Sequence, residues 1–306
     1  MKRILVTGAT GFIGRQTLSF LSRRGYEVHA LTSRPAPADS STVKWHHADL
    51  FNDDQTRTVI ADVRPSHLLH FAWYAEPGKF WQSDENFRWL EASLSLLRNF
   101  ADHGGRRVVM SGSCAEYDWS SGLCSETSTP CRPATPYGTC KNALHEALSS
   151  FCSEKGLSGA WGRIFFLYGP GEHGPKLVAS VVSSLLQGQA ARCTHGNQVR
   201  DFLHVEDVAS AFVALLDSKV EGAVNIASGN PTTIRDIVLM AADQCAARER
   251  VEFGAIAAPA NEPPLLVADV RRLRNEVGWM PEYQIGTGIE QTVQWWKSQL
   301  QGTGSK

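Results

Sequence analysis

The sequence lacks the patterns that indicate a metal site, a disulfide framework or a membrane span. Its seven cysteines are odd in number and widely spaced, and none of them forms a Cys-x-x-Cys pair. No apolar stretch approaches the roughly 20 residues that a membrane-spanning helix requires. The 30 basic and 31 acidic residues nearly cancel, so no excess charge favours nucleic acid or an anionic membrane. We therefore expect no metal, no nucleic-acid partner and no membrane association, and we expect the reducing cytoplasm as the compartment.

What the sequence does contain is a glycine-rich segment directly after its first apolar run. Residues 3–7 favour a buried parallel strand, and Gly8, Gly11 and Gly14 follow at three-residue spacing, where a helical pattern begins. Glycines at such a turn let the backbone approach a pyrophosphate, and the N-terminus of the next helix supplies N–H donors. We therefore expect a dinucleotide site in this loop.

Strands alternate with helices through the first half of the chain. Further strands are expected at 27–31, 44–47, 67–72, 107–111 and 158–166, and helices at 53–63, 85–103 and 136–155. This alternation is typical of an α/β fold with a doubly wound parallel sheet, which we assign to residues 1–166, with 200–230 returning to it. Residues 167–306 are expected to form a smaller, mixed α/β domain that binds substrate.

Tyr137 and Lys141 stand four residues apart near the start of an expected helix. Residues at this spacing share a helix face, so the ammonium can lie near the phenol. A cation held there favours the phenolate and brings a phenol pKa of about 10 toward the working range. Ser113 follows a buried strand and can hydrogen-bond a carbonyl oxygen while Tyr137 delivers the proton. These three residues are predicted to be catalytic, in hydride chemistry at a carbinol or ketone.

The order of the motifs resembles the extended short-chain dehydrogenase/reductase family, in its nucleotide-sugar epimerase, dehydratase and reductase branch. The matching segments include VTGATGFIG at 6–14, SGSCAEY at 111–117, YGTCK at 137–141 and RDFLHVEDVA at 200–209. The resemblance implies a Rossmann-like sheet, an NAD(P) cofactor, a nucleotide-diphosphate sugar substrate and a homodimer through the helices at 85–103 and 137–155.

The resemblance also implies particular binding residues. The cofactor would be held by Gly8, Gly11, Phe12, Ile13, Gly14, Ser33, Arg34, Asp49, Leu50, Phe71, Ala72, Tyr137 and Lys141. The substrate would meet Trp73, Cys114, Lys176, Arg192 and Arg200. Among these, Arg200 would bind a phosphate of the nucleotide-sugar. Lys176 or Arg192 would replace a second arginine that relatives carry shortly before Glu262.

Two reactions of this branch are disfavoured by the side chains beside Ser113. The 4,6-dehydratases carry an Asp–Glu pair after the catalytic Thr, where this chain has Cys114 and Ala115. The epimerase-reductases that make GDP-fucose carry an acid–base Cys and a His at the positions of Ala115 and Gly171. What remains is reduction of a 4-keto sugar, or epimerisation at C4 through a transient 4-ketone.

The end of the second strand favours one of these two reactions. An acidic residue there would accept the ribose hydroxyls of NAD, whereas basic residues suit the 2′-phosphate of NADP. The strand ends in Leu31, Thr32, Ser33 and Arg34, without an acid. NADP(H) is therefore favoured over NAD(H), which favours an NADPH-dependent 4-ketoreductase in deoxysugar biosynthesis. The alternatives are a 4-epimerase with tightly bound NAD and a non-enzymatic dinucleotide sensor, which would not need the Ser–Tyr–Lys set.

Two features of the sequence have no assigned role. Residues 73–81 are unusually rich in aromatic side chains, which either wall the sugar pocket or belong to the core and the dimer contact. Glu116 stands where the family has an apolar residue.

Overall fold

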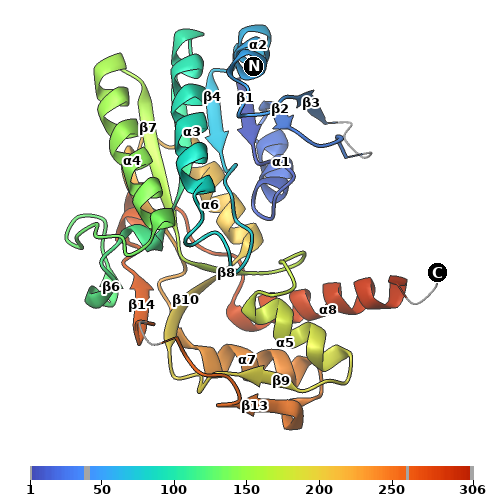
Figure 1. Cartoon of the computed structure of the whole chain (residues 1–306). Helices are drawn as coiled ribbons and strands as arrows, with labels where there is room; N and C mark the ends of the chain where they lie inside the picture. Colours follow the sequence, from blue (N-terminus) through green and yellow to red (C-terminus); the bar gives the residue numbers. More distant parts are fainter. Residues whose placement is uncertain (1, 38–41, 260–261, 304–306) are drawn as a thin grey trace.

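The computed structural model describes residues 2–37, 42–259 and 262–303, and its largest element is a seven-stranded parallel sheet (Figure 1). The strands are β1 (Arg3–Thr7), β2 (Glu27–Thr32), β3 (Val43–His47), β4 (His67–His70), β5 (Arg107–Ser113), β7 (Ser158–Ile164) and β11 (Gly222–Ile226). They lie in the order β11-β7-β5-β4-β1-β2-β3. The order reverses between β1 and β4, and a crevice for ligands opens at such a point in sheets of this kind.

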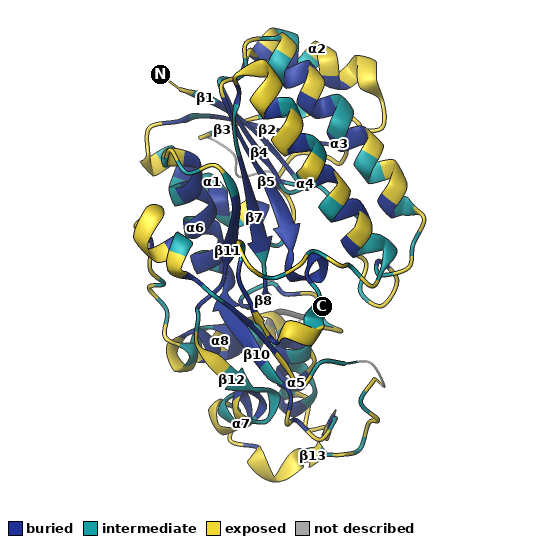
Figure 2. Ribbon diagram, turned by 90° about the vertical axis from the view of Figure 1, so that its left-hand side faces the viewer, coloured by how far each residue is buried: buried dark blue, intermediate teal, exposed yellow. Residues whose placement is uncertain are grey.

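Helices cover both faces of this sheet (Figure 2). On one face lie α1 (Gly14–Arg23) and α6 (Val205–Asp217), and on the other α2 (Asp53–Val63), α3 (Glu85–Asp102) and α4 (Pro136–Lys155). The strands are buried between the two helical layers, and Leu5, Leu69 and Val109 have no exposed surface. This double burial explains the nearly continuous apolar runs of the central strands. The predicted doubly wound α/β fold is confirmed.

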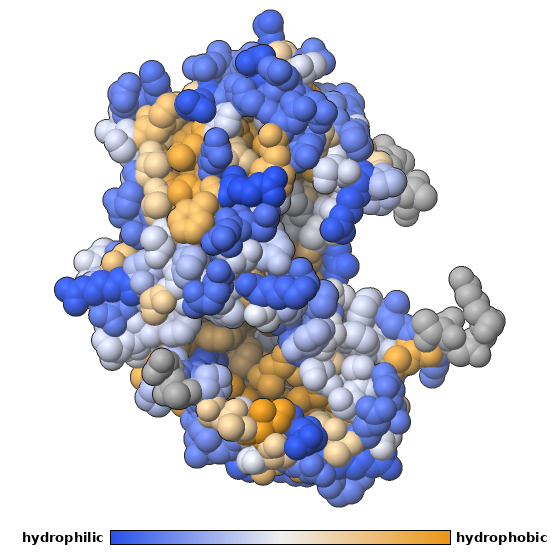
Figure 3. Space-filling model, in the orientation of Figure 1, coloured by the Kyte–Doolittle hydropathy of each residue, from blue (hydrophilic) through white to orange (hydrophobic). Residues whose placement is uncertain are grey.

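A second group of elements packs below the carboxyl ends of these strands (Figure 1). Its five-stranded sheet contains β6 (Leu123–Cys124), β8 (Phe166–Tyr168), β10 (Val199–His204), β12 (Pro231–Thr233) and β14 (Leu265–Ala268). A ribbon of β9 (Ala191–Cys193) and β13 (Val251–Phe253) lies beside α5 (Leu177–Leu186), α7 (Ile234–Gln244) and α8 (Ile285–Thr303). The surface is hollowed in the region of α5 and α7, and apolar side chains show in this hollow (Figure 3).

Short helices complete the chain. They are η1 (Cys114–Glu116), η2 (Trp119–Ser121), η3 (Arg248–Arg250) and the π-helical turn η4 (Arg272–Glu276). None of the helices in the described ranges combines the length and apolar character needed to cross a bilayer.

Some element boundaries differ from those expected from the sequence. The expected strand at 158–166 is two strands, because the chain leaves the large sheet after Ile164 and β8 pairs with β10 instead. The polar segment at 192–200 contributes to β9 and β10. These strands are three to six residues long, and periodicity is a weak signal over so short a stretch.

Candidate active site

The glycine loop after β1 makes a turn that side chains would block. Gly8 has a φ of +67°, and a Cβ on it would lie 2.7 Å from the backbone nitrogen of Ala72. A Cβ on Gly14, the first residue of α1, would lie 2.2 Å from the Gly8 carbonyl oxygen. The turn therefore brings β1, β4 and the N-terminus of α1 together, which leaves backbone donors available to an anionic ligand. Phe12 and Ile13 lie half-buried in the same loop.

The other predicted cofactor residues follow neighbouring strands at the same edge of the sheet. Ser33 and Arg34 are exposed at the end of β2, where the Arg34 amide donates to the Thr32 hydroxyl at 3.0 Å. Asp49 and Leu50 follow β3, with Asp49 exposed and Leu50 buried. Phe71 and Ala72 follow β4 and are half-buried. A cradle of tight glycine turns with polar groups at the ends of β2 and β3 fits a dinucleotide.

The structure brings Ser113 and Tyr137 together. Ser113 ends β5, and Tyr137 lies in the first turn of α4, which Thr135 caps by accepting from the Gly138 amide. The Ser113 hydroxyl lies close enough to the Tyr137 phenol to oppose the rise of its pKa. A hydroxyl and a phenol in contact at the carboxyl end of a buried strand can polarise an oxygen and exchange a proton with it.

Lys141 lies on the next turn of α4 and is almost fully buried. Its Nζ donates to the Ser111 carbonyl oxygen at 2.8 Å and lies 3.9 Å from the centroid of the Trp73 ring. Burial lowers the pKa of Lys141 to about 7. Burial also raises the pKa of Tyr137. In this arrangement the ammonium is turned toward Ser111, and desolvation is the main effect on the Tyr137 pKa. That Lys141 favours the phenolate stays a prediction.

Aromatic side chains surround the predicted catalytic residues. The Trp73 indole N–H donates to the Asn86 side chain at 2.9 Å, which fixes its ring against Lys141. The ring centroids of Phe80 and Trp81 lie 4.9 and 5.6 Å from that of Tyr137, both in edge-to-face geometry. Such contacts favour one orientation of the phenol. Of the two roles open to the aromatic segment, this position beside Tyr137 favours the pocket wall.

The predicted substrate residues are spread over a wider region. Arg200 is 2% exposed and its guanidinium pairs with Glu262 at 2.9 Å. Lys176 precedes α5 and its Nζ lies 5.2 Å from the Phe80 ring centroid, on the side of Tyr137. Cys114 is buried, and burial raises the pKa of its thiol.

Arg192 lies apart from these residues, exposed on β9, where it donates to the Ala255 carbonyl at 3.2 Å. Of the two candidates for a second phosphate contact, Lys176 is thus the one beside the aromatic wall formed by Phe80 and Trp81.

Glu116 is part of the site, although its place in the sequence suggested no role. Its carboxylate accepts from the Ser113 backbone amide at 2.7 Å and from the Arg163 guanidinium at 2.7 Å. The signal was present in the sequence, because Ser113 and Glu116 have the Ser-x-x-Glu spacing of a capping box at the start of η1.

Comparisons with known proteins agree on one family. Residues 4–227 match the model of the NAD dependent epimerase/dehydratase family. A UDP-glucose 4-epimerase of Rhizobium meliloti (strain 1021) is 27% identical, over 98% of this chain and 98% of its own. A dTDP-6-deoxy-L-talose 4-dehydrogenase (NAD(+)) of Aggregatibacter actinomycetemcomitans is 26% identical, over 77% of this chain and 87% of its own. The crystal structure of the Thermus thermophilus UDP-glucose 4-epimerase in complex with NAD has a TM-score of 0.85 at 27% identity, covering 96% of this chain and 99% of that one.

Substitution of Gly8 should show how closely the glycine loop is packed. Gly8→Ala is expected to lower the free energy of unfolding by about 2–4 kcal/mol, because the methyl group meets the Ala72 backbone and φ is positive. Gly25→Ala is the matched control, with a φ of +75° and nothing within 4 Å of a Cβ, and should cost about 1 kcal/mol. Urea unfolding followed by circular dichroism measures both. Equal losses would contradict the close approach.

Proposed function

This chain belongs to the NAD dependent epimerase/dehydratase family, and we propose that it epimerises a nucleotide-linked sugar at C4. The observation that carries the proposal is the contact between Ser113 and Tyr137, with Lys141 one helical turn away. The similarity to two UDP-glucose 4-epimerases over nearly the whole chain supports the choice of reaction. We further propose that residues 1–166, joined by 200–230, bind the cofactor and that 167–306 bind the sugar.

The glycine loop provides the place for a nicotinamide dinucleotide. Gly8, Gly11 and Gly14 would hold its pyrophosphate at the N-terminus of α1, and Asp49 and Leu50 would lie toward its adenine. When bound, the dinucleotide supplies the acceptor and donor of hydride at C4. NAD is the cofactor in the complex of the Thermus thermophilus 4-epimerase, which supports NAD here.

The chain's own residues would handle the proton and the substrate. Ser113 would hydrogen-bond the oxygen on C4, and Tyr137 would take up and return its proton. Burial raises the pKa of Tyr137, so its resting form is the neutral phenol. Tyr137 must therefore lose its own proton to solvent before it can take one up from the C4 hydroxyl, and the Lys141 ammonium would stabilise the phenolate that forms. Arg200 and Lys176 would contact the diphosphate of the nucleotide-sugar, with Arg200 exchanging its present partner Glu262.

A 4-ketoreductase is the second candidate, and the end of β2 favours it. Ser33 and Arg34 are exposed there, where a 2′-phosphate of NADP would lie, and no carboxylate occurs from Leu31 to Arg34. The protonated phenol of Tyr137 is also the form that delivers a proton to a ketone. The relative from Aggregatibacter actinomycetemcomitans, named as a 4-dehydrogenase, supports redox chemistry at C4 without epimerisation.

Cofactor content separates the two candidates. For the 4-epimerase we expect about one NAD per chain to be released when the purified protein is denatured. We also expect UDP-glucose to be converted to UDP-galactose with no cofactor added. For the 4-ketoreductase, the purified protein would be empty and would oxidise NADPH in the presence of a nucleotide-linked 4-keto-6-deoxy sugar. Absence of all these activities, with no dinucleotide bound, would overturn both candidates.

Removal of the Tyr137 hydroxyl tests the proton transfer in either reaction. Tyr137→Phe should lower kcat by about 10²–10⁴-fold, because the proton on the C4 oxygen loses its partner, while the fold is kept. Tyr26→Phe is a matched control. Tyr26 directly precedes β2, remote from the carboxyl ends of the strands, and its hydroxyl binds Asp217. Loss of this hydroxyl should leave kcat unchanged. Steady-state assays and circular dichroism measure the two effects. A Tyr137→Phe variant with wild-type turnover would remove this residue from the mechanism.

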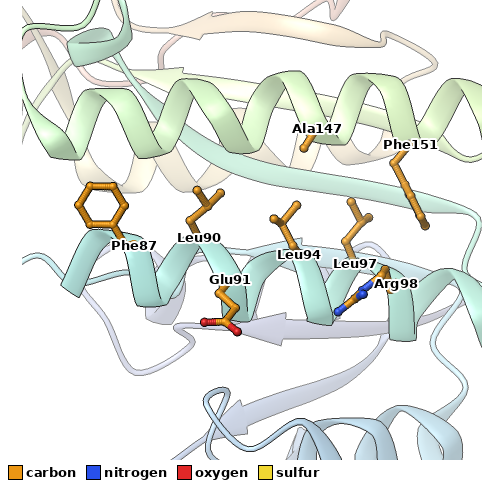
Figure 4. Close-up of a pocket in the computed structure, with 8 residues that line it drawn as sticks. All are labelled: Phe87, Leu90, Glu91, Leu94, Leu97, Arg98, Ala147 and Phe151. Atoms are coloured by element: carbon orange, nitrogen blue, oxygen red, sulfur yellow. The ribbon is translucent and has the colours of Figure 1, made fainter. Parts of the chain in front are cut away.

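We also propose a homodimer through α3 and α4. An apolar groove runs between these two helices (Figure 4), and Phe87 at one end is 53% exposed. Apolar side chains also gather over α3 and α4 on the molecular surface (Figure 3). The groove is lined by Phe87, Leu90, Glu91, Leu94, Leu97, Arg98, Ala147 and Phe151. A second copy that presents the same face would cover it by two-fold pairing.

A charge placed on this face should separate the subunits. Phe87→Glu is expected to convert a dimer into a monomer, because the carboxylate would be buried without a partner in the interface. Met280→Glu is the control, since Met280 is 65% exposed and lies outside the groove. Light scattering after size-exclusion chromatography gives the masses. A monomeric wild-type protein, or a dimeric Phe87→Glu variant, would contradict the proposal.

A further inference from the structure

A fully buried carboxylate lies directly beneath the predicted catalytic set, at a place where the family pattern has an apolar residue. We infer that Glu116 is a positioning residue for this site: its carboxylate fixes the backbone of Ser113 and places a negative charge below Tyr137 and Lys141. The inference rests on the proposed function, because it assigns Glu116 a part in the reaction of Ser113, Tyr137 and Lys141. It goes beyond that function by naming what holds these three in a working state.

Every partner of this carboxylate is a hydrogen-bond donor. The Ser113 amide donates at 2.7 Å, the Trp161 indole N–H at 3.0 Å and the Arg163 Nε at 2.7 Å. Burial raises the pKa of Glu116 above its ordinary value, and the charge of Arg163 and these hydrogen bonds oppose that rise without cancelling it. The geometry of the partners bears directly on its charge. A protonated carboxyl would need an acceptor for its own hydrogen, and these three partners all donate. The carboxylate is therefore held in its ionised form.

The contact with Ser113 also sets how its hydroxyl can be used. The Ser113 oxygen accepts from the Ala115 amide at 3.2 Å, while Glu116 accepts from the Ser113 amide, so the two form a reciprocal capping box. The hydroxyl oxygen is thus anchored from the η1 side. Its hydrogen stays free to donate toward Tyr137 or a substrate oxygen.

Close packing leaves the carboxylate little freedom to move. Gly112 lies beside it on β5, and a Cβ there would come within 2.6 Å of the Glu116 carboxylate and 2.0 Å of the Trp161 indole nitrogen. The Trp161 ring in turn lies 5.9 Å from the Lys141 Nζ. Trp161 thus lies between Glu116 and Lys141: its indole N–H donates to the Glu116 carboxylate, and its ring faces the Lys141 ammonium.

Electrostatics connects Glu116 to the catalytic lysine. The titratable or charged groups around Lys141 and Glu116 are His70, Cys114, Tyr117, Cys131, Tyr137, His145 and Arg163. Burial lowers the pKa of His70 and His145 to about 3 and about 4, so both are neutral near pH 7. Burial also raises the pKa of the listed thiols and phenols, which stay neutral too.

Glu116 is therefore the one negative charge of this group. Burial lowers the pKa of Lys141, and the charge of Glu116 opposes that effect. Removal of the negative charge should release the lysine proton at a lower pH, since an anion nearby favours the ammonium form. If activity needs protonated Lys141, the loss of activity with rising pH would then begin at a lower pH than in the wild type.

Three variants separate this role from a merely structural one. Glu116→Gln keeps the shape and removes the charge. Glu116→Asp keeps the charge and shortens the side chain. The double variant Glu116→Gln with Arg163→Met removes both members of the buried ion pair, so that no uncompensated charge is left in the core.

For Glu116→Gln we expect kcat to fall about 10–100-fold, with KM for the nucleotide-sugar changed less than about threefold. The alkaline fall of kcat should move down by about one pH unit. The Lys141 Nζ, followed by NMR on ¹⁵N-lysine-labelled protein and assigned with Lys141→Arg, should show the same downward shift. Glu116→Asp should keep the Lys141 pKa close to that of the wild type.

The double variant supplies the decisive comparison. A positioning role predicts that its kcat stays low, whereas a purely structural ion pair predicts recovery to within about threefold of the wild type. That recovery, or a Lys141 pKa unchanged in Glu116→Gln, would overturn the inference. If the wild-type protein converts no nucleotide-sugar, the proposed function fails, and the NMR titration of Lys141 still decides the role of Glu116.

Discussion

The backbones of β1 and β4 come together at their carboxyl ends, where the nitrogen of Ala72 leaves no room for a side chain on Gly8. This approach closes the turn that starts α1 and places its N-terminus at the point where the strand order reverses. Ser113 and Tyr137 lie at the same edge of the sheet. Ser113 ends β5, which pairs with β4, and Tyr137 lies in the first turn of α4, which packs against β5. A site between distant segments of the chain thus depends on one close contact between two strands.

Desolvation is the second physical theme of the site. Lys141, Glu116 and Arg163 are buried together with the Tyr137 phenol beside them, so charge here is costly unless it is paired. The cost is offset by the donors on Glu116 and by the carbonyl and indole partners of Lys141. The same burial explains why the Tyr137 pKa rises although a lysine stands one helical turn away. A network of this kind holds its members in defined positions, which catalysis requires of groups that exchange protons.

The choice between epimerisation and reduction depends on different parts of the molecule. The overall similarity to UDP-glucose 4-epimerases favours NAD and a returned hydride. The end of β2, with exposed Ser33 and Arg34, favours NADP and a hydride that leaves with the product. The aromatic wall formed by Phe80 and Trp81 is common to both proposals, because it contacts Tyr137, which both reactions use.

The parallel sheet, the glycine loop and the family could be predicted from the sequence. These depend on local signals: apolar runs, the spacing of glycines, and motifs whose order can be read from the sequence alone. The helices at 53–63 and 136–155 begin and end where the sequence indicates, because each has a capping residue or a breaker at its boundary. Short strands such as β8 and β9 were missed, since pairing with a remote partner stabilises them and three residues carry no periodicity.

Only the tertiary structure decided how the site residues meet. The spacing of Tyr137 and Lys141 predicted a shared helix face, but the direction of the ammonium is set by Ser111 and Trp73, which come from two other parts of the chain. Glu116 stands out in the sequence as a charge in an apolar place, and its partner Arg163 is 47 residues away on β7. Composition and motif order determine the class of fold, because those signals are local. Charge states and contacts in the site depend on burial and on pairs brought together by folding, which no local pattern contains.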